Sequence, residues 1–212
     1  MTSFSSPDFK ELREDLQKAK TKGVPYDDMK EPLDKVLAVL DQIVPVANEL
    51  KSYYEAKTYT TDNYAKEQQL GPKYVQLYEQ FYAVYPTLND IIHKHNIENQ
   101  QEQLKALKDA GKKNAAAAQE AHLRLTAVLD NFEGGKPIDV NAVNQELQAI
   151  SDVANSVNSK EYEHTKKSLN KTIGAIRTFM AVQNTENYND MIEEYNDLIG
   201  DMNNLDVNKL DK

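Results

Sequence analysis

Apolar residues recur at three- and four-residue steps along most of the chain, which is the spacing of helices that bury one face. The first strong stripe starts near Met29. Its members are Leu33, Val36, Leu37, Leu40, Ile43, Val44, Ala47, Leu50 and Tyr54. Alternation of apolar and polar residues with period two, which marks half-buried strands, does not occur. The pattern therefore predicts an all-α fold.

Five further helices are predicted by the later stripes. They cover about 62–96, 115–132, 140–157, 159–180 and 188–205. Thr61 or Asp62 is suited to cap the second helix, and the EGGKP segment at 133–137 is the clearest turn. The spacing leaves open whether the last two stripes form one helix that bends at QNTEN, residues 183–187.

Three prolines, Pro45, Pro72 and Pro86, fall inside helical stripes. A proline removes a backbone donor and crowds the preceding turn, so we expect a kink at each position. A helix over 62–96 would run about 50 Å at 1.5 Å per residue. We therefore expect an elongated antiparallel bundle of about five to six helices with proline kinks.

The apolar content divides the chain into three regions. Residues 1–28 hold few apolar residues and are expected to form an N-terminal arm or tether. Within this arm, Ser6 or Asp8 could cap a short helix. We assign 29–205 to a single helical-bundle domain and 206–212 to a C-terminal tail.

Five aromatic residues fall within YVQLYEQFYAVY, residues 74–85, in a chain that has no tryptophan. At 100° per residue, Tyr74, Tyr78, Phe81 and Tyr85 share one helix face, whereas Tyr82 lies off it. The favoured interpretation is a core face whose phenol oxygens reach the rim of the bundle.

An aromatic groove is the alternative interpretation, since eight of the twelve tyrosines lie within residues 53–85. Tyrosines at a rim can stack on sugars or on peptide side chains. The rim residues that would bind a partner are Tyr53, Tyr59, Tyr64 and Tyr82.

Composition and charge exclude several classes of protein. The net charge of −9 argues against a nucleic-acid binder, whose affinity comes from lysine and arginine. The chain has no cysteine, which removes disulfides, thiolate nucleophiles, zinc–thiolate sites and iron–sulfur clusters. No stretch approaches 18 uninterrupted apolar residues, and the opening residues do not resemble a signal peptide.

Motifs that carry chemistry are scarce. No P-loop, dinucleotide-binding glycine motif or nucleophile elbow occurs. His93 and His95 are two residues apart and so point to different sides of a helix. Glu161 and His164 have the Glu-x-x-His spacing of di-iron bundles, but such a site needs a second pair and two further carboxylates. We therefore expect no catalytic residue, no cofactor and no metal site.

Several segments resemble the YiiG-like bacterial lipoproteins, a family catalogued as a domain of unknown function. The resemblance rests on Asn48 with Tyr53 and Tyr54, and on the D-N-Y-A-K block at 62–66. It continues in a pattern of Tyr85, Leu88 and Ile92, and ends in the Tyr195-Asn196 element. It covers about 29–205. It implies an extracytoplasmic, lipid-tethered helical domain whose lipid-bearing cysteine lies outside this chain, and it carries no catalytic residues.

The leading hypothesis is a non-enzymatic, envelope-anchored helical domain that binds a protein or a wall component. Its membrane contact would be limited to the lipid tether, and nucleic acid is not an expected partner. One alternative is a cytosolic self-associating or scaffold helical protein, which applies if no tether exists. The other is a metal- or small-molecule-binding bundle.

Overall fold

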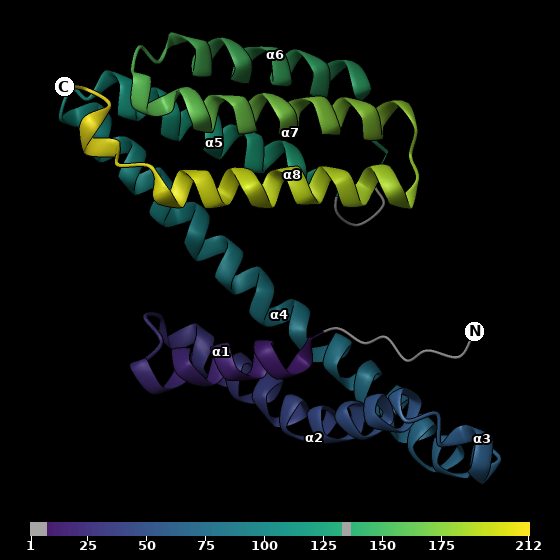
Figure 1. The fold of residues 1–212 in the computed structure, drawn as a ribbon. Helices are drawn as coiled ribbons and strands as arrows, with labels where there is room; N and C mark the ends of the chain where they lie inside the picture. Colours follow the sequence, from purple (N-terminus) through teal and green to yellow (C-terminus); the bar gives the residue numbers. More distant parts are fainter. Residues whose placement is uncertain (1–7, 133–136) are drawn as a thin grey trace. The chain divides into compact units, whose positions relative to one another are not determined.

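A computed structural model describes residues 8–132 and 137–212 of the chain (Figure 1). These residues form eight α-helices and three short 3-10 turns, and the described part contains no strand. The prediction of an all-α fold is confirmed. The alternative cap at Ser6 and most of the predicted turn at 133–137 lie outside the described residues.

The chain divides into two compact units, Met1–Asn96 and Ile97–Lys212. The boundary falls inside the range 29–205 that the sequence assigns to one domain. The limits of that domain, of the arm and of the tail stay predictions. Each unit has its own cluster of buried apolar side chains.

The first unit is built from three packed helices and one short turn of helix. Its elements are α1 (Phe9–Lys22), α2 (Lys30–Glu55), α3 (Tyr59–Asp62) and the part of α4 (Ala65–Asp109) up to Asn96. Asp8 caps α1, because its carboxylate accepts a hydrogen bond from the Glu11 N–H at 3.0 Å. The predicted cap is thus observed at Asp8.

The core of the first unit lies between α2 and one face of α4. Most of the predicted α2 stripe is buried. From α4, Leu77, Phe81 and Leu88 are buried, and α1 adds Phe9, whose ring centroid lies 5.1 Å from that of Phe81. The arm helix is therefore held to the unit by an aromatic contact at its first residue.

The second unit contains the end of α4 and four further helices. These are α5 (Lys113–Asp130), α6 (Val140–Ser156), α7 (Glu163–Ala181) and α8 (Thr185–Asn204). The turn after α4 uses Gly111 at φ +69°, a conformation that favours glycine. The α7 and α8 helices are separate, and Asn184 caps α8 by accepting from the Asn187 N–H at 2.7 Å.

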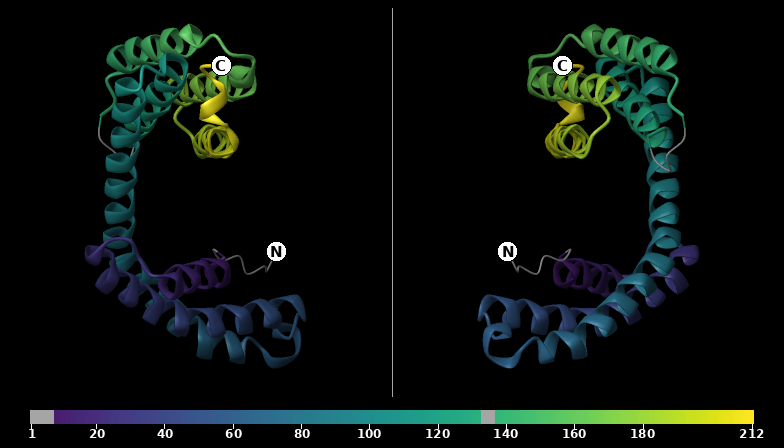
Figure 2. Two further views of the ribbon diagram at one scale, coloured as in Figure 1. Left: turned by 90° about the vertical axis from the view of Figure 1, so that its left-hand side faces the viewer. Right: turned by 90° about the vertical axis from the view of Figure 1, so that its right-hand side faces the viewer.

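Neighbours in the chain pack against each other in the second unit: α5 contacts α6, α6 contacts α7, and α7 contacts α8. The α7 and α8 helices run side by side in every view (Figures 1 and 2). The C-terminal residues close the unit at the start of α5. There Leu210 is buried, and the Asp211 carboxylate accepts the N–H groups of Asn114 and Ala115 at 2.7 and 3.0 Å.

The predicted count of five to six helices is wrong for the described residues. The six predicted stripes correspond to α2 and α4–α8, while α1 comes from the arm and α3 is a single turn. Four residues are too few to show a helical period, so spacing could not reveal α3. Helix α2 continues past Pro45, and α4 continues past Pro72 and Pro86; kinks at these prolines stay a prediction.

Candidate functional site

In the described residues, no three histidine, cysteine, aspartate or glutamate side chains are grouped so that they could hold a metal ion. Glu161 and His164, the predicted Glu-x-x-His pair, are both exposed. The pair therefore lies on a solvated surface rather than inside the bundle.

A serine, an aspartate and a histidine meet between α7 and α8, but in the wrong order for a catalytic triad. The Ser168 hydroxyl donates to Asp201 Oδ2 at 2.6 Å, and His164 Nε2 lies 3.2 Å from Asp201 Oδ1. A nucleophilic serine needs the histidine beside its hydroxyl, with the carboxylate behind the histidine. Here the carboxylate stands between them, so the arrangement joins two helices and does not activate the serine.

Four tyrosine side chains lie close together where α2 ends and α4 begins, around α3. Figure 1 shows the position of α3. We call Tyr53, Tyr54, Tyr59 and Tyr64 the tyrosine cluster. The centroid of the Tyr59 ring lies 6.3 Å from that of Tyr53 and 5.8 Å from that of Tyr54. Tyr59 and Tyr64 are stacked, with centroids 5.4 Å apart and planes 17° from parallel. These separations lie within the range of favourable aromatic pairs.

Around the cluster, three of eight consecutive residues have a backbone in the left-handed region, with positive φ. Lys57, Asn63 and Tyr64 have φ values of +52°, +52° and +62°. Asparagine tolerates this left-handed conformation, but a tyrosine does so at a cost of roughly 1–2 kcal/mol. The conformation of Tyr64 must therefore be stabilised by its surroundings.

Asp62 supplies that stabilisation. Its Oδ1 atom accepts the Tyr64 N–H at 3.0 Å and the Tyr53 hydroxyl at 2.7 Å, while its Oδ2 atom accepts the Lys66 N–H at 3.2 Å. The carboxylate thus caps the start of α4 and ties it to the end of α2. A second tie is the ion pair of Lys66 with Glu49, whose charged atoms are 2.7 Å apart.

The two cluster tyrosines on α2, Tyr53 and Tyr54, resist loss of their phenol protons. Burial, followed by the hydrogen bond to Asp62, raises the pKa of Tyr53 far above its usual value. Burial and a hydrogen bond to Glu67 raise the pKa of Tyr54 to about 12. Burial acts to raise the pKa of Asp62, but the hydrogen bonds from Tyr53 and from backbone N–H groups outweigh it and lower that pKa. At neutral pH the phenols are neutral and Asp62 is charged.

The four predicted rim residues differ in exposure and in position. Tyr53 is only 3% exposed, so it supports the cluster from inside and cannot serve as a rim. Tyr59 is half-buried, and Tyr64 is 37% exposed. Tyr82 is 51% exposed but lies apart from the cluster, on α4, where its ring contacts Tyr78 and Phe81. Within the cluster, Tyr64 is therefore the exposed ring, and Tyr59, which stacks on it, is half-buried beside it.

Two supporting residues, Asp62 and Glu67, were not among the predicted site residues. The sequence pointed to a structural role for Asp62, because it was one of two predicted caps for the second helix. It gave no indication of a role for Glu67, since the partner of Glu67, Tyr54, lies in another helix.

Comparison with known families places the chain. The model of a family described as "Protein of unknown function (DUF3829)" matches residues 1–185. The chain belongs to this family. No curated protein and no solved structure matches it. Within the described residues, no helix combines the length and the apolar character needed to cross a membrane.

Proposed function

We propose that the chain is a non-catalytic binding domain of the cell envelope, and that it binds a protein or a wall component through Tyr59 and Tyr64. The observation that carries the proposal is the stacked ring of Tyr64 on a left-handed backbone held by Asp62. Strained residues persist where the surroundings fix them, and they concentrate at functional sites. Rigid tyrosine rings supply contact area at little entropic cost.

A non-catalytic role agrees with the chemistry of the cluster. A general acid or base works best with a pKa near the operating pH. The pKa values of Tyr53 and Tyr54 are both raised, and the carboxylates of Asp62 and Glu67 already accept hydrogen bonds from these phenols. These phenols and carboxylates thus stabilise the structure of the cluster through hydrogen bonds to one another.

The envelope location rests on the resemblance to the YiiG-like lipoproteins, which includes Tyr53, Tyr54 and the 62–66 block of the cluster. In this proposal a lipid tether preceding the domain anchors the protein outside the cytoplasm. Fractionation of the native protein tests this part. Recovery in the membrane or envelope fraction supports it, and recovery in the cytosol alone contradicts it.

A thermal-melt panel tests binding and identifies the class of ligand. Glycan fragments, peptides, lipids and envelope proteins are added separately to the wild type and to the Tyr64→Ala variant. A ligand at 100 times its Kd adds about 2.7 kcal/mol of stability. We expect one class to raise the Tm of the wild type and to do so much less with Tyr64→Ala. A shift of equal size in both proteins would place binding elsewhere.

A further inference from the structure

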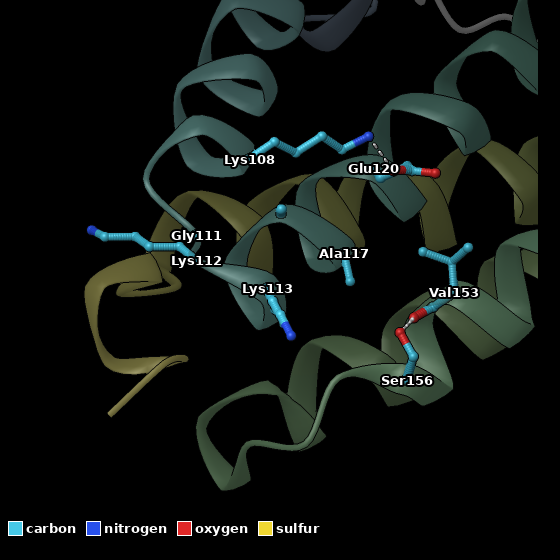
Figure 3. Close-up of a pocket in the computed structure, with 9 residues that line it drawn as sticks. Lys108, Gly111, Lys112, Lys113, Ala117, Glu120, Val153 and Ser156 are labelled. Atoms are coloured by element: carbon cyan, nitrogen blue, oxygen red, sulfur yellow. Dashed lines mark hydrogen bonds and ion pairs between the residues drawn. The ribbon is translucent and has the colours of Figure 1, made fainter.

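A pocket of about 430 Å³ lies in the second unit, beside the turn that joins α4 to α5 (Figure 3). Its volume falls in the range of small-molecule sites. Its walls come from the end of α4, the first turns of α5 and the end of α6. The pocket shares no residue with the tyrosine cluster, so an inference from it does not depend on the proposed function.

The floor of the pocket is apolar. Ala116 and Ala117 from α5 and Val153 from α6 form it. Alanine side chains end at Cβ, so they leave space between the two helices that a longer apolar side chain would fill. An aliphatic group placed on this floor would bury apolar surface from both sides.

The polar part of the pocket is positive, although the whole chain carries −9. Three lysines and one glutamate line it, which gives the lining a net charge of +2. The ammonium of Lys108 lies 2.7 Å from Glu120 Oε2, and that of Lys112 donates to Asn208 Oδ1 at 3.0 Å. These two lysines already have partners.

Lys113 is different. Its side chain extends toward the space beside Ser156, whereas that of Lys112 points the other way (Figure 3). Its ammonium has no ion-pair partner in the described residues. Two N–H groups of the first turn of α5, those of Asn114 and Ala115, are not available to an anion, since Asp211 accepts them. Lys113 is thus the group at this pocket that can receive a negative charge.

We propose that this pocket binds a small aliphatic carboxylate, with its carboxylate at Lys113 and its chain on Ala116, Ala117 and Val153. One unpaired ammonium matches the single charge of a carboxylate. A phosphate dianion is better matched by the bidentate fork of arginine, and no arginine lines the pocket. The apolar floor selects for a carboxylate with a hydrocarbon chain over the bare anion.

Titration of the whole protein with octanoate, followed by NMR chemical shifts or calorimetry, tests the proposal. Acetate supplies the charge without the chain, and octanol supplies the chain without the charge. We expect saturable octanoate binding, with acetate and octanol each at least about tenfold weaker. Shifts should concentrate on the amides of Lys113, Ala116, Ala117 and Val153, and the affinity should fall as salt is added.

Variants distinguish octanoate binding at this pocket from nonspecific binding elsewhere on the protein. Lys113→Gln should weaken octanoate binding about tenfold. The control Lys105→Gln should not, because Lys105 pairs with Asp109 outside the pocket. Ala117→Trp fills the floor and should abolish binding; if that variant does not fold, Val153→Phe serves the same purpose. Equal affinity for octanol and octanoate, equal losses in the two lysine variants, or no saturable binding at millimolar octanoate would overturn the proposal.

Discussion

The phenol of Tyr53 donates a 2.7 Å hydrogen bond to the carboxylate of Asp62, nine residues further along the chain. The same oxygen accepts the N–H of Tyr64, the residue whose backbone is left-handed. Tyr53, buried on α2, thereby positions the Asp62 carboxylate, and this carboxylate positions the backbone of the exposed Tyr64. The contribution of these hydrogen bonds to stability can be measured.

Removing either partner of this hydrogen bond should destabilise the protein. Asp62→Ala removes three hydrogen bonds and should cost about 2–3 kcal/mol, since bonds to a charged group are worth about 1.5–3 kcal/mol. Tyr53→Phe leaves Asp62 its backbone bonds and some contact with water, so we expect about 1–2 kcal/mol. Urea unfolding followed by circular dichroism gives both values. Thr61→Ala is the control, because its hydroxyl bonds only to the local Thr58 carbonyl, and it should cost under about 0.5 kcal/mol.

Substitutions along α4 should rank by burial. Phe81 is 5% exposed and lies against Phe9, so Phe81→Ala should cost about 3–5 kcal/mol. Tyr82→Ala should stay below about 1 kcal/mol, because that ring is 51% exposed. Tyr78 is half-buried, and its substitution should fall between the two. Equal losses at Phe81 and Tyr82 would show that this face of α4 is not a core face.

Helical spacing predicted much of the fold, because burial on one face is the same requirement for every helix. It also placed Phe81, Leu77 and Leu88 in the core. It could not show that the buried stripes belong to two separate clusters, since a stripe carries no information on which helix covers it. The three left-handed residues also escaped prediction, because Lys57 and Tyr64 rarely adopt that conformation.

The candidate site was predicted only in part. The concentration of tyrosines drew attention to the region of the tyrosine cluster, but Tyr53, which was assigned to the rim, is buried. Its burial depends on a hydrogen-bond partner, Asp62, that satisfies its hydroxyl inside the structure. Tyr82 shares a residue type with the cluster but lies within α4, where its ring contacts Tyr78 and Phe81. Residue type and spacing together do not distinguish these environments.

The C-terminal residues should stabilise the second unit by capping α5. Asp211 accepts two backbone N–H groups at the start of α5, and the side-chain amide of Asn114 donates to the Leu210 carbonyl at 2.7 Å. Asp211→Ala should cost about 1 kcal/mol. Hydrogen exchange of the Asn114 and Ala115 amides should speed up accordingly. Asp197→Ala, an exposed position within α8, is the control; unchanged exchange in Asp211→Ala would show that the cap contributes nothing.

His122 should make the protein less stable in mild acid. Its side chain is buried in α5, its Nδ1 atom has no hydrogen-bond partner among the described residues, and burial lowers its pKa. The unfolded chain, with a histidine pKa of about 6.5, therefore binds more protons than the folded one just below that pH. Stability falls as the pH decreases through this window and recovers as it rises.

Unfolding free energies between about pH 7 and pH 5 test this dependence. His122→Phe should flatten the profile, since a phenylalanine of similar size carries no proton. Gln145→Ala, at an exposed position of α6 that carries no titratable group, should keep the wild-type slope. The same slope in wild type and His122→Phe would contradict the assignment.

Binding through Tyr59 and Tyr64 is the central claim, and comparison of two tyrosine variants tests it most directly. Tyr64 and Tyr188 are similarly exposed, at 37% and 39%, but only Tyr64 belongs to the cluster. Affinities of wild type, Tyr64→Ala and Tyr188→Ala for the purified ligand class from the melt panel are compared. We expect Tyr64→Ala to lose more than about tenfold in affinity, as at a binding hot spot, and Tyr188→Ala to match the wild type. Equal affinity in all three proteins would contradict the claim.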